Sequence, residues 1–444
     1  MTIRKAGSAR EPFHRIRGRF RDGRGRSGER TGTTRTGVSP DRSIPRAAVK
    51  AGDLSRDRRG RIRSMPPILH YGFRPFFFLA ALYAGLAIPA WLWMYFSGNG
   101  MSGPFPGLQW HMHEMLFGYL AAVMTGFILT AIPNWTGRLP LSGWPLAGLV
   151  GLWVAGRIAC TFIPQPIAAA LLDLAFPAAL AFAIWREVLA GKNWKNAPVA
   201  IMITLFGVAN ALHYGEGLGW TPPGLGPRLA LAVAAALIAL IGGRIVPSFT
   251  RNWLVKKGRF ALPASFGLVD KAALAGAVLA ALSWAAFPDS EATGALMILA
   301  GLLLFARLFR WRGGATLREP ILFVLHAGYG WLAVAFLLLG VSRLTGAVPQ
   351  SAALHALTAG AIGTMTLAVM TRASLGHTGR EIVADRATVA IYLAVTAGAV
   401  LRVLAPFAGD RYAIVLGCGG ALWSAAFLLF ALRYAPILWG PRAT

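Results

Sequence analysis

Two histidines and a glutamate stand together at the start of one long apolar stretch of this sequence. The segment WHMHEMLFGYLAAVMTGFILTAIPNWTG covers residues 110–137 and places His111, His113 and Glu114 in its first turn. A helix that crosses a bilayer needs ~20 mostly apolar residues, and ionisable groups at membrane depth are rare. Such groups usually mark a ligand, ion or proton site, so these three residues are the first candidates for function.

The spacing of the two histidines predicts that they face different neighbours. Imidazole nitrogen is a common protein ligand of haem iron, copper and zinc. Residues i and i+2 of a helix point to nearly opposite sides, whereas i and i+3 share a face. The pattern therefore aligns His111 with Glu114 and turns His113 elsewhere. One histidine could bind a metal while the other contacts a second cofactor or solvent; alternatively, both are interfacial histidines wetted by lipid headgroups.

The elements that position these residues are predicted to be membrane-spanning helices. Of the 444 residues, 56% are hydrophobic and only 14% are charged, which indicates an all-α polytopic transmembrane bundle and excludes ordinary soluble domains. Apolar runs of about membrane length predict about twelve spans, of which the sixth and eighth are short. These are residues 75–96, 111–133, 144–161, 167–185, 197–212, 229–246, 269–286, 294–306, 320–341, 352–370, 387–407 and 414–432.

The distribution of Lys and Arg predicts the orientation of the bundle. One alternating set of loops holds sixteen of these residues and the opposite set holds three, and the cytoplasmic side keeps the positive charge. Both termini are therefore expected in the cytoplasm. The His111 end of the second span is then expected at the outer face.

The predicted depths separate the eight histidines into groups. Ligands of one metal must come from spans that meet at one level of the bundle. Four histidines share the outer level and are the predicted metal ligands: His111, His113, His213 and His355. His326 lies about two turns in from the cytoplasmic end of the ninth span. It is a further candidate for cofactor binding, although an interior hydrogen-bonded histidine is the alternative.

The other buried polar residues point to structure more than to chemistry. Arg157 and Asp173 flank the short turn at 162–166, so one helical hairpin brings them to the same depth and predicts an ion pair. Cys160 and Cys418 stand alone, with no C-x-x-C-H motif for covalent haem and no four-thiolate set. We interpret both cysteines as small packed residues, and any haem as noncovalently bound.

The first 64 residues differ from the rest of the chain. They hold 19 Lys and Arg against 6 Asp and Glu and show almost no apolar periodicity, which predicts a disordered Arg-rich tail before a membrane domain at 65–444. Such a segment commonly enforces orientation and contacts membrane lipid, and we expect no nucleic-acid partner. A third interpretation is an artefact of start-site choice, because Met65 directly precedes PPILHYGFRPFF.

Two glycine- and arginine-containing strings are expected in cytoplasmic loops. They are GGRIVPSFTRN at 242–252 and TRASLGHTGR at 371–380. Glycine lets the backbone approach a ligand, and arginine suits phosphate or carboxylate. Neither string ends as a phosphate-binding loop does, and the sequence contains no Walker motif, nucleophile elbow or dinucleotide fingerprint.

Several long strings together resemble one family. They are HYGFRPFF at 70–77, WHMHEMLFGY and GFILTAIPNWTGR within 110–138, GGRIVPSFTRN at 242–252 and HALTAGAIGTMTLAVMTRASLGHTGR at 355–380. In this order they resemble the NnrS family of bacterial twelve-span inner-membrane proteins linked to the nitric oxide response. The resemblance covers about residues 65–440 and does not include the tail.

The resemblance implies a membrane protein that contains haem b and copper, protects against nitrosative stress and accompanies denitrification. Nitric oxide is then the expected small-molecule ligand, bound or processed at the metal centre, or else the protein relieves iron–nitrosyl damage. A redox activity toward nitric oxide is one expectation, and a regulatory protein without turnover is another. A polytopic transporter is the rival from a different class, since twelve spans are also its usual frame. The oligomeric state is left open.

Overall fold

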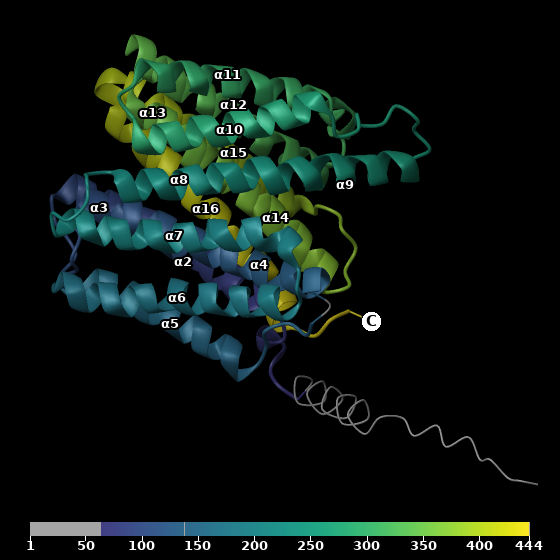
Figure 1. Cartoon of the computed structure of the whole chain (residues 1–444), viewed down its shortest axis with the longest axis horizontal. Coiled ribbons are helices and arrows are strands. Elements are labelled where there is room, and N and C mark those ends of the chain that lie inside the picture. The colour runs from purple at the N-terminus through teal and green to yellow at the C-terminus, as the bar shows by residue number, and fades with distance from the viewer. Residues whose placement is uncertain (1–63, 137, 444) are drawn as a thin grey trace, which may run out of the picture. The chain divides into compact units, whose positions relative to one another are not determined.

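The computed structural model describes residues 64–136 and 138–443, without the side chains of residues 134–136. Of the predicted Arg-rich tail, only Ser64 lies within the described residues (Figure 1). The described residues therefore correspond to the predicted membrane domain.

The predicted all-α bundle is confirmed. In the part that the structure describes, twelve helices are long and apolar enough to cross a membrane, and no strand is present. Three of the spans are built from consecutive α-helical and π-helical segments, and the others are single helices that in three cases carry a short 3-10 turn. In chain order the helices are α2 (Phe73–Ser97), α3 (Gly107–His113) with η2 (Glu114–Leu120) and α4 (Ala121–Thr136), α5 (Trp144–Phe162), α6 (Pro166–Ala190), η3 (Trp194–Asn196) with α7 (Ala197–Gly217), α8 (Leu225–Leu237) with η4 (Ile238–Gly242) and α9 (Gly243–Lys256), α10 (Leu268–Ala286), α11 (Glu291–Phe309), α12 (Pro320–Thr345), α13 (Gln350–His355) with η6 (Ala356–Ile362) and α14 (Gly363–His377), α15 (Arg386–Leu404) with η7 (Ala405–Phe407), and η8 (Gly409–Arg411) with α16 (Tyr412–Trp439).

Local sequence signals account for where many spans begin and end. In an apolar environment the backbone must satisfy its own hydrogen bonds, so long apolar runs become helices. Proline stands at the first turn of α5, α6, α7 and α12, where its missing N–H costs no helical hydrogen bond. Gly98 and Gly346 follow α2 and α12 with φ of 72° and 67°, a left-handed conformation that glycine adopts without strain.

Three spans contain a π-helical segment, and these spans are among the most deeply buried. The segments are η2, η4 and η6, in the second, sixth and tenth spans. A π-helical turn holds more residues than an α-helical turn and is frequent at functional sites. Two of the three segments begin directly after a histidine, His113 or His355.

The expectation that residues 242–252 and 371–380 form loops is wrong for most of both strings. The first lies in the end of η4 and in α9, which carries the sixth span on to Lys256, and the second is helical as far as His377. Both extensions bury one face, which includes Val246 and Leu254 in α9 and Ser374 and Leu375 in α14. The prediction ended each span where charged residues interrupt the apolar run. The helix continues past that point because one of its faces stays apolar and packs against the bundle.

The helices lie side by side, with α5 and α6 at one edge of Figure 1 and α10 and α11 at the other. The last helix, α16, packs against the first, α2. There the Arg74 guanidinium donates to the carbonyl oxygens of Leu438 and Gly440 at 2.8 and 2.7 Å. The described ends of the chain thus meet, which agrees with an even number of crossings between them.

Candidate functional site

The structure divides His111, His113, His213 and His355 into two pairs on either side of α3. The ring centroids of His111 and His355 are 6.4 Å apart, with ring planes only 11° from parallel. Those of His113 and His213 are 5.7 Å apart with an angle of 23°. The i, i+2 spacing therefore separates His111 from His113, as the sequence indicates. His326 belongs to neither pair, and its Nε2 lies 2.9 Å from Thr250 Oγ1 of α9.

His111 and His355 both line the larger of two neighbouring cavities, which has a volume of about 330 Å³ and which we call the histidine cavity. Its walls come from α2, α3, η2, α8, α13, η6, α15 and α16, and most of its lining is apolar. The indole of Trp91 stacks on the His111 ring with 4.3 Å between centroids. The cavity therefore combines a large apolar volume with two imidazoles from different spans.

Several nitrogen atoms at the histidine cavity have no protein partner. Nδ1 of His355 lies 2.7 Å from the carbonyl oxygen of Ser351 and must donate to it, because a carbonyl only accepts. This fixes the tautomer and leaves the lone pair on Nε2. Among the described residues, Nδ1 of His111 and Nε and Nη1 of Arg402 are buried without a hydrogen-bond partner. Buried polar atoms are normally paired, so these atoms point to a missing ligand.

On the other side of α3, both ring nitrogens of His113 are already engaged. Nδ1 lies 2.9 Å from Glu114 Oε1, while Nε2 lies 2.9 Å from Asn210 Oδ1 and 3.2 Å from Asp173 Oδ2. Every one of these partners is an oxygen acceptor, which is the arrangement of a doubly protonated imidazolium. The ring of Phe105 packs against both histidines of this pair, with its centroid 4.7 Å from that of His113 and 5.0 Å from that of His213.

Arg157 joins the two carboxylates beside His113 into one closed group. Its guanidinium donates to Glu114 Oε2 at 2.5 Å and to Asp173 Oδ1. The side-chain amide of Asn210 donates to Asp173 Oδ2 at 2.7 Å, and the Tyr83 hydroxyl donates to Glu114. We call this group the ion network; its members are Tyr83, His113, Glu114, Arg157, Asp173 and Asn210.

The predicted ion pair between Arg157 and Asp173 is confirmed, but the predicted alignment of His111 with Glu114 is wrong. Glu114 contacts Arg157, Tyr83 and His113. It is also the first residue of η2, where the wider π-helical turn changes which side chains share a face. Regular α-helical spacing from His111 therefore predicts the wrong face for Glu114.

Two glycines make room for the ion network. A Cβ on Gly118 would lie 2.7 Å from Arg157 Nη1 and 2.9 Å from Glu114 Oε2. A Cβ on Gly156 would lie 2.6 Å from Asp173 Oδ1. Real Cβ contacts are longer than this, so the charged groups meet only because both positions lack a side chain.

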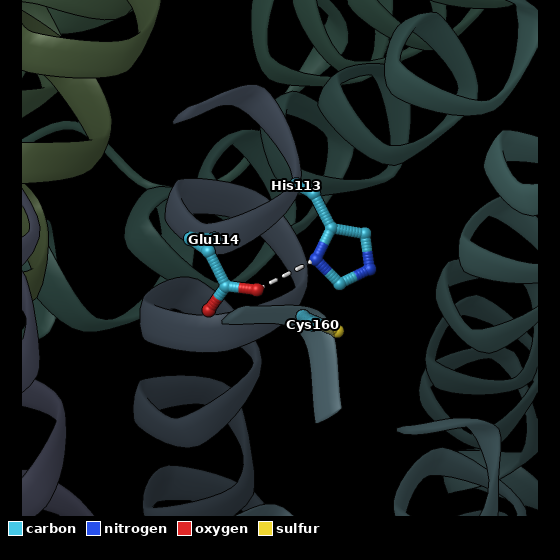
Figure 2. Close-up of side chains that lie close together, drawn as sticks. All are labelled: His113, Glu114 and Cys160. Carbon is cyan, nitrogen blue, oxygen red and sulfur yellow. Dashed lines mark hydrogen bonds and ion pairs between the residues drawn. The ribbon is translucent and has the colours of Figure 1, made fainter. Parts of the chain in front are cut away.

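His113, Glu114 and Cys160 form a group that could hold a metal ion, because one ligand atom of each lies within 4.8 Å of the others (Figure 2). The Cys160 Sγ is also 3.1 Å from the Tyr214 hydroxyl. Imidazole and thiolate are ligands that copper and zinc accept. The interpretation of Cys160 as a packing residue therefore missed its proximity to His113 and Glu114. Cys160 stands three residues after Arg157 on one helix, and this spacing could have indicated that the two side chains share a face.

Sequence reasoning did not select Arg402, Asn210, Tyr83 or Trp91. The first two carried a usable signal, since Arg402 and Asn210 are polar residues inside predicted spans. The glycines of the tenth span serve close packing: a Cβ on Gly360 would lie 2.6 Å from the Trp331 ring, and one on Gly363 would lie 2.8 Å from Trp423 Nε1. They provide tight helix contacts and no space for a flat cofactor.

Comparison with known proteins identifies the same family that the sequence strings resemble. A search of curated proteins finds no match for this chain. The family described as NnrS protein matches residues 67–442, which include every described helix that crosses the bundle. A match over most of the chain, together with twelve spans and a histidine-rich outer level, assigns it: the chain belongs to the NnrS family.

Proposed function

We propose that this chain is a haem- and copper-containing inner-membrane protein of the bacterial nitric oxide response. Its role is to protect the cell against nitrosative stress by binding or processing nitric oxide or by relieving iron–nitrosyl damage. Family membership supports the general role. The observation that carries the cofactor assignment is the placement of His111 and His355 in one cavity.

His111 and His355 would hold a haem iron, because their imidazoles come from different spans and line one cavity. Their ring centroids are 6.4 Å apart, and their ring planes differ by 11°. The Ser351 carbonyl holds His355 in the tautomer whose Nε2 is free, which is the usual arrangement behind a histidine ligand.

The remaining walls of the histidine cavity suit the rest of a haem. A haem is apolar except for its two propionates, and carboxylates bind arginine strongly. Arg402 lines the cavity and has two buried nitrogens without a partner among the described residues. Trp91, Leu116 and Trp423 supply apolar surface. We assign Arg402 to the propionates and the two histidines to the iron.

When bound, haem would supply one-electron redox chemistry and an iron that binds nitric oxide. The protein then holds the group noncovalently, fixes the orientation of both imidazoles and excludes water through the apolar walls. Nitric oxide is small and uncharged, so it reaches the cavity through the bilayer without a charged channel. A redox turnover of nitric oxide is the enzymatic form of this proposal.

We assign copper to the group formed by His113, Glu114 and Cys160. Its ligand types support this assignment, because copper accepts imidazole and thiolate. Metal ligands must give up their protons, so copper would replace the proton that His113 shares with Glu114. His213 lies beside this group, with its ring centroid 5.7 Å from that of His113.

The transporter alternative has less support in the structure. A transporter of polar solutes needs a binding site near the middle of its spans. Where α4, α8, η4 and α14 meet, the cavity lining is apolar apart from Thr366. The buried ions are instead paired with one another toward the ends of the spans, Arg157 with Glu114 and Asp173, and Arg307 with Asp270.

The orientation rests on the Lys and Arg distribution and the even number of spans. It places both termini in the cytoplasm and the histidine cavity toward the outer face. Reporter fusions after Thr444 and within residues 97–110 test this placement. A signal from outside the cytoplasmic membrane for the C-terminal fusion would contradict it.

The deciding experiment is a reduced-minus-oxidised visible spectrum, with metal analysis, of the purified full chain. His355→Ala should remove the Soret band, and Cys160→Ser should lower copper and leave the Soret band. His377→Ala, at the far end of the same span, and His326→Ala are the matched controls and should keep both cofactors. Full haem in His355→Ala at normal protein level would overturn the assignment.

A further inference from the structure

A second, smaller cavity lies next to the histidine cavity; it is almost wholly apolar and is partly open at the protein surface. Its volume is about 100 Å³, and we call it the inner cavity. Side chains from η2, α4, α7, α8, η4, α9, η6 and α14 line it. Its one polar side chain, Thr366, already shares its hydroxyl with Tyr119 at 2.5 Å and with the Gly363 carbonyl at 3.0 Å. No free polar group among the described lining residues is left to hold water.

The chemistry of this lining selects its ligand. A buried water needs two to four polar partners, whereas apolar cavities stay dry and bind apolar molecules such as xenon. Charged or strongly polar solutes would lose their hydration here without compensation. A volume of about 100 Å³ holds only a few heavy atoms. A small nonpolar or weakly polar gas therefore fits both the size and the lining.

The inner cavity is connected to the histidine cavity through shared wall residues. Leu120 and Ile362 line both. Leu120 is the last residue of η2, and Ile362 is the last residue of η6. The third π-helical segment contributes Ile238, Ile241 and Gly242 to the inner cavity. The three irregular segments thus converge on this space, where a wider helical turn packs less regularly than an α-helix.

We propose that the inner cavity is a docking site for a diatomic gas, and that Leu120 and Ile362 control its passage to the histidine cavity. The proposal rests on the proposed function, since it identifies nitric oxide or a gas of similar size as the molecule that waits there. It adds a binding site next to the histidine cavity, with Leu120 and Ile362 in the wall of both. The gas is held by dispersion contacts alone, so it exchanges rapidly.

The first test uses xenon and requires no haem. Purified protein, with or without cofactor, is exposed to xenon under pressure, and the bound atom is located by anomalous scattering from crystals. Xenon should lie between Leu120, Ile362 and Ala234. Ala234→Phe should exclude it, because the new ring fills the space, and Val369→Phe provides a second blocking variant at a half-buried lining position. Ala295→Phe, the same change at an exposed site of α11 that lines neither cavity, should leave xenon bound.

The second test follows nitric oxide itself in the haem-loaded protein. After a laser pulse releases nitric oxide from the iron, a nearby docking site should return much of it before it escapes. The blocking variants should change this rapid recombination several-fold, and Ile362→Ala should speed exchange between the cavities. Ala295→Phe should match the parent protein.

The outcomes separate this inference from the proposed function. Absence of haem with xenon still bound would overturn the cofactor assignment and leave the gas site standing. Haem present with no xenon in the inner cavity would overturn the gas site alone. Xenon bound in the parent and equally in both blocking variants would also overturn it.

Discussion

The two faces of α3 carry similar residue types in different surroundings: one face borders a cavity, and the other borders a group of paired charges. On one face, His111, His355 and Arg402 surround a cavity and leave nitrogen atoms unpaired. On the other, the buried side chains of His113, Glu114, Arg157 and Asp173 pair with one another. Two cations and two carboxylates balance there, and desolvated charges persist only when paired in this way. Unpaired nitrogens do not by themselves separate the two faces, because His213 Nε2 and Arg157 Nε also have no partner among the described residues. The difference is that His111, His355 and Arg402 line a cavity.

The largest effect that tests this comparison is the loss of haem from one face only. His111→Ala should abolish the Soret band, because it removes one of two ligands at an open cavity. His113→Ala should keep the Soret band, since both ring nitrogens of His113 are already engaged elsewhere. Visible spectra of the two variants at equal protein level make the comparison. Haem loss in His113→Ala with full haem in His111→Ala would exchange the roles of the two faces.

The next largest effect concerns the ion network. Arg157→Met leaves Glu114 and Asp173 without their shared cation, and removal of one partner from a buried ion pair costs ~3–5 kcal/mol. The triple variant with Glu114→Gln and Asp173→Asn should recover part of this loss, because no uncompensated charge remains. Thermal unfolding of the detergent-solubilised protein measures both. Equal damage in the triple and single variants would mean that the network contributes by shape instead of charge.

A smaller effect is expected from closing the space that the network needs. Gly118→Ala should destabilise the protein by ~1–3 kcal/mol, because the added Cβ would meet Arg157 and Glu114 at under 3 Å. Gly148→Ala in α5 is the matched control, since a Cβ there meets nothing within 4 Å. Alanine in a helix interior is favoured over glycine by roughly 0.5–1 kcal/mol, so the control should be neutral or stabilising. A neutral Gly118→Ala would show that the network has room to shift.

The smallest effect concerns the charged edge of the histidine cavity. Arg402→Gln should accelerate haem loss ~10-fold, equivalent to about 1.4 kcal/mol, since it would remove a charge partner for a propionate but keep His111 and His355. Transfer of haem to an excess of apomyoglobin gives the rate. Arg411→Gln, at an exposed position that lines neither cavity, should leave the rate unchanged. Equal rates in the two variants would remove Arg402 from the assignment.

Parts of the fold and of the site followed from sequence patterns because their causes are local. Apolar runs of membrane length placed all twelve spans, and a short hairpin placed Arg157 opposite Asp173. The same reasoning ended the sixth and tenth spans too early. Polarity marks where a bilayer stops, whereas the helix continues for as long as one face packs, as α9 and α14 do.

The sequence by itself determined that this is a twelve-span helical bundle, and it predicted His111, His113 and His355 as candidate ligands. Tertiary structure alone decided which histidines meet, because partners such as Asn210 and Arg402 are distant in the chain and their approach depends on packing between helices. It also decided where Glu114 points, since η2 departs from the regular helical count. Periodicity predicts the face of one helix, and only packing supplies the neighbour across from it.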